Sequence, residues 1–338
     1  MIIVVKPGAE KSQIKDIIDF LENNGLKTHI SEGTQRTIIG VVGDKTRIAG
    51  TNIALMDGVE KIVPIVESYK LVNRVFKPEG TIIKFDKDIS VGGNRISLMA
   101  GPCAVESEEQ IFKVAESISK SGAQFLRGGA FKPRTSPYAF QGLEVEGLKY
   151  MRKAADKFGL KVVSEIVSES DLDKSAEYID VIQIGARNAQ NFRLLREVGK
   201  IKIPVLLKRG IAQTIDEWLG SAEYVMSEGN YEIILCERGI RTFETSTRNT
   251  LDIGAIPVLK SKTHLPVIID PSHAAGYAGY ISALSKGAVA AGADGLIIEV
   301  HPDPKCAVSD ALQQITPIQF NELAKELRLI ADAIGRKI

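Results

Sequence analysis

The chain has 338 residues, enough for one large domain and a smaller one. Its formal net charge of +1 provides no overall basic field, so we expect no nucleic-acid partner. No apolar run reaches the length of a membrane span, and no basic segment followed by an apolar one begins the chain. We therefore expect a cytoplasmic protein that does not bind membranes.

Residues 1–69 predict a small α+β domain. Short β-branched runs predict four strands, at residues 2–5, 28–30, 37–42 and 59–66. Apolar residues at helical spacing predict two helices, at residues 14–21 and 46–55. This order is typical of a split-βαβ sandwich. The segment has no acid–base cluster and no glycine-rich phosphate loop, so we expect it to bind a ligand or to pack.

The segment 70–95 predicts a linker that ends in a hairpin, and residues 96–338 form a regular alternation. Continuous apolar runs recur at residues 96–100, 124–126, 161–165, 181–184, 204–207, 232–235, 266–269 and 295–298. Helical segments separate these runs, and capping signals mark helix starts at Ser107, Thr214 and Thr316. Such strands are buried on both faces of a parallel sheet, and eight units match a closed (β/α)8 barrel. An open doubly wound sheet is the weaker alternative, because no G-x-G-x-x-G turn follows the first strand.

Ionisable residues follow every predicted barrel strand, at the end where such barrels carry their chemistry. Six of them are cations: Arg127, Lys132, Arg134, Arg187, Lys208 and Arg238. Arginine matches the oxygens of phosphate and carboxylate groups, and six cations exceed the needs of one phosphate. The set indicates two phosphorylated substrates, or one phosphate with a carboxylate. For any single cation, a structural ion pair with Glu165 or Glu237 is the competing interpretation.

A second group at the same ends could surround one divalent ion. It consists of Cys103, His273, Glu299 and Asp310, after the first, seventh and eighth strands. Sulfur, nitrogen and oxygen ligands together favour Mn, Fe, Co or Zn. The spacing alone is weakly specific, because a lone cysteine at a strand end is more often a small core residue. We interpret Cys236 in that way.

Several long motifs in the barrel carry a family resemblance: AGPCAVES, LRGGAFKPRTSPYAFQGL, QIGARNAQNF, LLKRG, CERGIRTFE, DPSH and IIEVHP. They resemble 3-deoxy-D-arabino-heptulosonate 7-phosphate (DAHP) synthase, in the branch related to 3-deoxy-D-manno-octulosonate 8-phosphate (KDO8P) synthase. The chain departs from the family pattern at Ala278-Gly279 and at Ala311, and neither departure removes a proposed ligand.

The resemblance implies a metal-dependent transferase that condenses phosphoenolpyruvate with erythrose 4-phosphate, the first step of the shikimate pathway. It implies that Cys103, His273, Glu299 and Asp310 ligate the metal, with Lys132, Cys103 and His273 as catalytic residues. Phosphoenolpyruvate would be held by Arg127, Lys132, Arg187, Lys208 and Arg238, with Glu165 and Ala186 in the same site. Lys132, Arg134, Thr135 and Ser136 would face the second substrate and its phosphate.

The resemblance also extends to the N-terminal segment, which is similar to a ferredoxin-like regulatory domain. It implies feedback inhibition by tyrosine or phenylalanine, with His29 and Ser31 near the inhibitor, in a homotetramer. The alternative for this segment is a packing or oligomerisation module.

Three other functions stay open from the residues. The acceptor could be arabinose 5-phosphate, as in KDO8P synthase. Lys208 at a strand end could form a Schiff base, as in barrel aldolases. The barrel could also be a sensor of phosphorylated metabolites without enzymatic activity.

Overall fold

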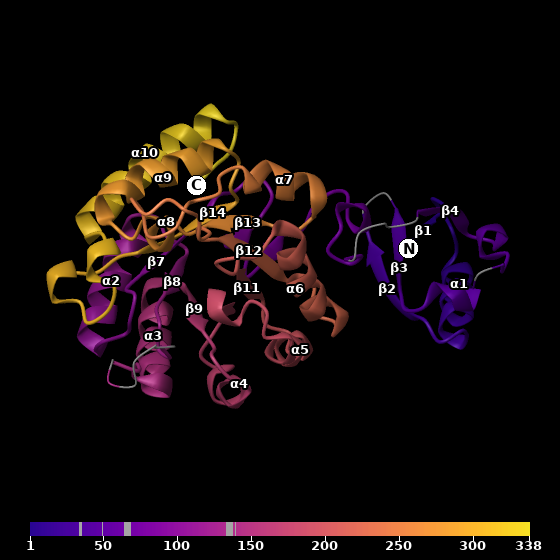
Figure 1. Cartoon of the computed structure of the whole chain (residues 1–338), viewed down its shortest axis with the longest axis horizontal. Coiled ribbons are helices and arrows are strands. Elements are labelled where there is room, and N and C mark those ends of the chain that lie inside the picture. Colours follow the sequence, from indigo (N-terminus) through magenta and orange to yellow (C-terminus); the bar gives the residue numbers. More distant parts are fainter. Residues whose placement is uncertain (34–35, 49, 64–68, 133–137, 139) are drawn as a thin grey trace. The chain divides into compact units, whose positions relative to one another are not determined.

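The computed structural model describes residues 1–33, 36–48, 50–63, 69–132, 138 and 140–338 (Figure 1). Contacts within the chain separate two compact units. One contains residues 1–80 together with 261–264, and the other contains residues 81–260 and 265–338. Within the described ranges, no helix is both long enough and apolar enough to cross a membrane.

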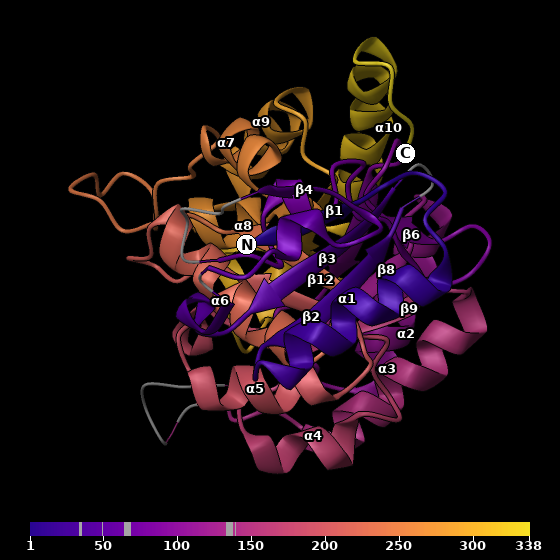
Figure 2. The ribbon, with the colours of Figure 1, turned by 90° about the vertical axis from the view of Figure 1, so that its right-hand side faces the viewer.

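The N-terminal unit is built on a four-stranded antiparallel sheet with the strand order β2-β3-β1-β4. Its elements are β1 (Ile2–Val5), α1 (Lys11–Asn23), β2 (Lys27–Glu32), β3 (Thr37–Val42) and β4 (Val59–Val63). The central strand β1 pairs with β3 and β4, and α1 lies along one face of the sheet (Figure 2). Ile17 and Leu21 of α1 pack there in one core cluster with Ile3 and Ile39. The arrangement confirms the predicted ferredoxin-like fold.

The predicted helix over residues 46–55 is wrong. Two 3₁₀ turns occupy this segment, at Lys45–Ile48 and Ile53–Leu55. Gly50 lies between them with a φ of +83°, a left-handed conformation that interrupts an α-helix. Thr51 and Asn52, which follow it, are weak helix formers. The apolar spacing therefore marks residues that face the core, such as Ile48 and Ile53, without a continuous helix.

The larger unit is a closed barrel of parallel strands in which β14 returns to pair with β7. The strands are β7 (Ser97–Gly101), β8 (Phe125–Arg127), β9 (Lys161–Glu165), β10 (Val181–Ile184), β11 (Val205–Lys208), β12 (Ile233–Glu237), β13 (Val267–Ile269) and β14 (Gly295–Glu299). The closure confirms the predicted (β/α)8 barrel and excludes the open doubly wound sheet.

Helices cover the outside of the barrel, and the short helix α8 (Pro271–Ala275) begins directly after β13 (Figure 1). The others are α2 (Glu108–Lys120), α3 (Glu144–Phe158), α4 (Glu169–Ser175), α5 (Phe192–Lys200), α6 (Ile215–Ser227), α7 (Ala255–Lys262), α9 (Ala278–Ala290) and α10 (Pro317–Ala333). Reciprocal capping boxes at Thr214 and Thr316 begin α6 and α10, as predicted. At the start of α2, Ser107 accepts a hydrogen bond from the backbone N–H of Gln110.

Apolar side chains close one end of the barrel. The hairpin of β5 (Ile83–Lys84) and β6 (Ser90–Val91) packs Ile83 and Val91 into the same core cluster as Phe125 and Val181. Phe125 and Val181 begin their strands, so the hairpin covers the amino-terminal end of the barrel. The ionisable residues lie at the other end of the barrel, at the carboxyl-terminal ends of the strands.

Candidate active site

A cavity of about 560 Å³ lies at the carboxyl-terminal ends of the barrel strands. Among the described residues, its lining cations are Arg127, Lys132, Arg187, Lys208, Arg238, Arg241 and Arg248. The acidic residues of the lining are Glu165 and Asp310. Because the cations outnumber the carboxylates, the cavity favours anionic ligands.

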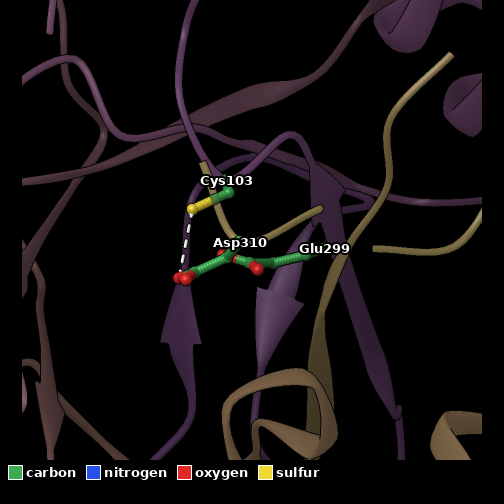
Figure 3. Close-up of side chains that lie close together, drawn as sticks. All are labelled: Cys103, Glu299 and Asp310. Carbon is green, nitrogen blue, oxygen red and sulfur yellow. Dashed lines mark hydrogen bonds between the residues drawn. The ribbon is translucent and has the colours of Figure 1, made fainter. Parts of the chain in front are cut away.

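Three of the four predicted metal ligands form a cluster beside this cavity. Cys103 follows β7, Glu299 ends β14, and Asp310 lies in the loop after β14; their side chains point toward one another (Figure 3). One ligand atom from each lies within 4.8 Å of the others, and Cys103 Sγ is 3.6 Å from Asp310 Oδ2. The cluster forms because β7 and β14 are neighbours in the closed barrel. One sulfur and two carboxylates are a donor set that fits Mn, Fe, Co or Zn.

His273, the fourth predicted ligand, lies beside the cluster. Its Nε2 is 3.6 Å from Glu299 Oε1. Its Nδ1 donates to Asp270 Oδ2 at 2.7 Å, and its backbone N–H donates to Asp270 Oδ1 at 2.9 Å. Because Nδ1 carries the proton in that hydrogen bond, Nε2 keeps a lone pair on the side of Glu299. This is the tautomer that metal binding through Nε2 requires.

Asp270 also forms a buried ion pair with Lys208. Burial opposes ionisation of the Asp270 carboxyl, but His273 and Lys208 hold its pKa well below the usual range. The carboxylate is therefore ionised and fixes two functional side chains at once. The sequence showed Asp270 at a strand end but gave no sign of this double role.

Two further cations contact the cluster directly. Arg127 NH1 donates to Glu299 Oε1 at 3.0 Å and to the carbonyl oxygen of Pro102 at 2.7 Å. Lys132 Nζ donates to the carbonyl oxygen of Cys103 at 2.9 Å and lies 3.2 Å from its Sγ. Arg127 and Lys132 therefore belong to the lining of the cavity and also contact the cluster.

The electrostatics of the cluster suit a divalent cation. Burial, aided by the charge of Glu299, raises the pKa of the Cys103 thiol to about 11. Burial also opposes ionisation of Glu299, but His273 and Arg127 bring its pKa below the ordinary value. A metal bound to the sulfur would displace the thiol proton, since a coordinating thiol is deprotonated. The two carboxylates already carry the negative charge that such an ion needs.

Two cations of the lining were not identified from the sequence. Arg241 and Arg248 lie in the loop after β12, and Arg248 NH1 is 3.4 Å from Asp310 Oδ2. A signal for Arg241 was present, since it belongs to the CERGIRTFE motif directly after a strand. Arg248 had no comparable signal, because it lies eleven positions after Glu237, the last residue of β12.

The remaining predicted site residues divide between the cavity and other places. Glu165 and Ala186 line the cavity with the cations. Arg134, Thr135 and Ser136 lie outside the described residues. Cys236 is fully buried in the barrel core, as interpreted from the sequence.

The two residues predicted for inhibitor binding lie on β2 of the N-terminal unit. His29 and Ser31 pair with Gly40 and Ile38 of β3, and alternate residues of a strand share one face of the sheet. Their neighbour Ile30 pairs with Ile39, which packs in the core on the α1 side. His29 and Ser31 therefore lie on the sheet face opposite α1. Burial, followed by the nearby charge of Lys27, lowers the pKa of His29.

Comparisons with known proteins agree across the whole chain. The family model described as the DAHP synthetase I family matches residues 80–334, and that of the DAHP synthase ferredoxin-like domain matches residues 1–67. A phospho-2-dehydro-3-deoxyheptonate aldolase from Thermotoga maritima is 50% identical over 338 residues, 100% of both chains. A 2-dehydro-3-deoxyphosphooctonate aldolase from Syntrophotalea carbinolica is 33% identical over 268 residues, 73% of this chain and 95% of that one.

Solved structures give the same result. The crystal structure of the DAHP synthase from Thermotoga maritima matches with a TM-score of 0.80 at 50% identity, covering 99% of this chain and 98% of that one. A truncated form of that organism's enzyme matches with a TM-score of 0.74, covering 79% of this chain. With a matching family model over the barrel and a full-length relative at this identity, the chain belongs to the DAHP synthetase I family.

Proposed function

We propose that the chain catalyses the metal-dependent condensation of phosphoenolpyruvate with erythrose 4-phosphate, giving DAHP and phosphate. The observation that carries this proposal is that a candidate metal site and a cationic cavity lie side by side at the carboxyl-terminal ends of the barrel strands. The Cys103–Glu299–Asp310 cluster adjoins a cavity lined mainly by arginine and lysine. This step would place the protein at the start of the shikimate pathway, which supplies aromatic amino acids.

The residues around the cavity would have different roles in this reaction. A divalent cation held by Cys103, His273, Glu299 and Asp310 would supply a Lewis acid for the aldehyde oxygen. Lys132, whose ammonium group lies beside Cys103, would donate a hydrogen bond to the same oxygen.

The cations of the lining would hold the carboxylate and phosphate groups, so that C3 of phosphoenolpyruvate attacks the aldehyde carbon. Water then adds at C2, and phosphate leaves by cleavage of its C–O bond. Fixing two anions side by side lowers the entropic barrier and offsets their repulsion.

Erythrose 4-phosphate is the proposed acceptor rather than arabinose 5-phosphate. The support is the relative from Thermotoga maritima, named a phospho-2-dehydro-3-deoxyheptonate aldolase, which matches at 50% identity over the full chain. The phosphooctonate aldolase of Syntrophotalea carbinolica matches at 33%, over 73% of the chain. The sequence Lys132-Pro133-Arg134-Thr135 also resembles the erythrose 4-phosphate enzymes.

The geometry argues against a Schiff-base mechanism at Lys208. A Schiff base needs a neutral amine as nucleophile. Lys208 is 3% exposed and its Nζ forms an ion pair with Asp270, so the amine is engaged by a carboxylate. Attack by Lys208 would also break its ion pair with Asp270, the carboxylate that orients His273.

Phosphate release from phosphoenolpyruvate tests the proposal, with erythrose 4-phosphate or arabinose 5-phosphate and with Mn²⁺ or a chelator. We expect metal-dependent release with erythrose 4-phosphate. Release with arabinose 5-phosphate alone would move the chain to the octulosonate reaction, and release in the chelator would contradict the metal role. Cys103→Ala should abolish turnover, whereas Cys236→Ala, which truncates the cysteine of the barrel core, should retain it.

We further propose that the N-terminal unit mediates feedback inhibition by tyrosine or phenylalanine. The family model for its ferredoxin-like domain and the position of His29 and Ser31 on one sheet face support this role. His29→Ala and Ser31→Ala should weaken inhibition by the effective amino acid while leaving uninhibited turnover unchanged. Equal inhibition of wild type and both variants would contradict the assignment of these residues. The homotetramer and the cytoplasmic location stay predictions.

A further inference from the structure

One buried side-chain amide contacts both carboxylates of the Cys103–Glu299–Asp310 cluster. Gln313 ends the 3₁₀ turn Ala311–Gln313 that follows Asp310, and it is 2% exposed. Its Nε2 donates to Glu299 Oε2 at 2.6 Å and lies 3.4 Å from Asp310 Oδ2. One side chain therefore contacts a carboxylate at the end of β14 and another in the loop after it.

The contact on the other end of this amide fixes its orientation. Arg248 NH1 donates to Gln313 Oε1 at 2.7 Å. A guanidinium has only donors, so the amide oxygen must face Arg248 and the amide nitrogen must face the carboxylates. Arg248 comes from the loop after β12, and it also lines the cavity. The orientation of Gln313 is thus set from a part of the chain 65 residues away.

A neutral donor suits this position because it holds the carboxylates and leaves their charge intact. Arg127 and Arg248 already lie against these carboxylates, and a further lysine or arginine here would add positive charge that opposes a divalent cation. Glutamine brings two N–H donors and no charge. Glu299 Oε2 is thereby engaged by the amide, and Glu299 Oε1 faces Arg127 and His273.

The backbone at Asp310 shows why such a contact is needed. Asp310 has φ +46° and ψ +41°, the left-handed region that is costly for a residue with a Cβ. Strained residues persist where surrounding contacts fix them. Here the backbone N–H of Gln313 donates to the Asp310 carbonyl oxygen at 3.2 Å, while the Gln313 amide and Arg248 approach the Asp310 carboxylate.

We propose that Gln313 is a positioning residue for the metal cluster, holding Glu299 and Asp310 in their ligand arrangement with an amide that Arg248 orients. The inference rests on the proposed metal-dependent function and names a residue of that site outside the predicted ligands. Loss of a contact that orients metal ligands lowers metal affinity by about 10- to 100-fold. That is the effect we expect from removing the amide.

The test uses the full chain, freed of metal with a chelator and titrated with Co²⁺. Visible absorption reports the coordination of Co²⁺, and competition with a chromophoric chelator gives its Kd. Gln313→Leu removes the amide at similar volume, and Gln313→Glu keeps the shape but loses the N–H donors. Gln124→Leu is the matched control, because Gln124 is also buried and bonds through both ends of its amide at the opposite end of the barrel.

We expect Gln313→Leu to raise the Co²⁺ Kd by about 10- to 100-fold and to change the absorption spectrum, with Gln124→Leu like wild type. If Gln313→Leu does not fold, Gln313→Glu must show the altered spectrum. A spectrum and a Kd unchanged in the folded Gln313 variants would overturn the positioning role and leave the metal site standing. Failure of wild type to bind Co²⁺ would overturn both proposals.

Discussion

Replacing Asp270 with asparagine tests whether this carboxylate orients His273 as a ligand of the proposed metal. Asp270 is 1% exposed and accepts hydrogen bonds from His273 Nδ1 and from the His273 backbone, besides its ion pair with Lys208. The asparagine has nearly the same shape but brings an NH₂ group and no charge. Its nitrogen must face a donor: in place of Oδ2 it faces both His273 Nδ1 and the Lys208 ammonium, and in place of Oδ1 it faces the backbone N–H of His273. We therefore expect a disordered imidazole and an uncompensated buried cation.

Two magnitudes follow from these contacts. Loss of the carboxylate that orients a ligating histidine lowers metal affinity by about 10- to 100-fold, or about 1.4 to 2.7 kcal/mol. Removing one partner of a buried ion pair lowers the free energy of unfolding by about 3 to 5 kcal/mol. We thus expect Asp270→Asn to lose both stability and metal affinity. Denaturant unfolding of the metal-free protein measures the first, and chelator competition on the folded protein measures the second.

A matched variant separates the two effects. Asp294 is also buried, forms ion pairs with Lys260 and Arg336, and accepts a hydrogen bond from the backbone of Val267. It precedes β14, at the end of the barrel away from the cavity. Asp294→Asn should lose comparable stability and keep its metal affinity. If Asp270→Asn also keeps its metal affinity within about threefold, His273 does not depend on Asp270 and the reasoning is refuted.

Two other perturbations test the fold and its link to the site. The buried imidazole of His264, which belongs to the N-terminal unit, has its pKa lowered to about 4, mainly by burial. In the unfolded chain this imidazole has a pKa near 6.5, so above that pH it is neutral in both states and costs no stability. As the pH falls from 6.5 toward 4, only the unfolded chain takes up the proton, and the free energy of unfolding decreases. Unfolding in urea should show a loss of about 2 kcal/mol between pH 7 and pH 5 that His264→Asn lacks; an equal loss in both proteins would contradict the assignment. Gly101 has a φ of +151°, and a Cβ there would lie 1.9 Å from the carbonyl oxygen of Arg127. Gly101→Ala should therefore separate β7 from β8 and lower both stability and Co²⁺ affinity. Gly159 is also at positive φ, but an added Cβ there meets open space, so Gly159→Ala should lower stability alone. If Gly101→Ala binds Co²⁺ as tightly as wild type, the spacing of β7 and β8 does not control the proposed metal site.

The fold was largely predictable because its signals are local. Each barrel strand is a short apolar run, and the helices between them begin at capping residues such as Thr214 and Thr316. The error at residues 46–55 has the same origin. Apolar spacing reports which residues face a core, whereas the turn at Gly50 depends on a backbone conformation that spacing does not encode.

The site was predictable only in part, because its contacts join distant segments. The strand ends located Cys103 and Glu299, since neighbouring strands of a closed barrel bring their ends together. Arg248 and Gln313 gave no such signal. Their roles arise from a contact across 65 residues, between a loop after β12 and a turn after β14. The position of Gln313 depends on its hydrogen bond with Arg248, and a single sequence does not show which residues of two loops will contact each other.

Lys132 contacts Cys103, and the other six cations of the cavity fall into two groups according to what they contact. One group forms ion pairs with carboxylates that belong to the metal cluster or orient it: Arg127, Lys208 and Arg248. The other group makes no ion pair with a carboxylate within the part of the chain that the structure describes: Arg187, Arg238 and Arg241.

This division would let one rim hold the proposed metal and the two proposed anionic substrates. Burial lowers the pKa of Arg238, so its uncompensated charge is costly until an anion arrives. An anion that contacts this second group gains attraction without breaking the ion pairs of the first. The carboxylates of the Cys103–Glu299–Asp310 cluster would therefore keep their cationic neighbours while the proposed substrates bind. We therefore expect the affinity for the proposed phosphorylated substrates to depend chiefly on the unpaired arginines, and the order of the proposed metal ligands to depend on the paired cations.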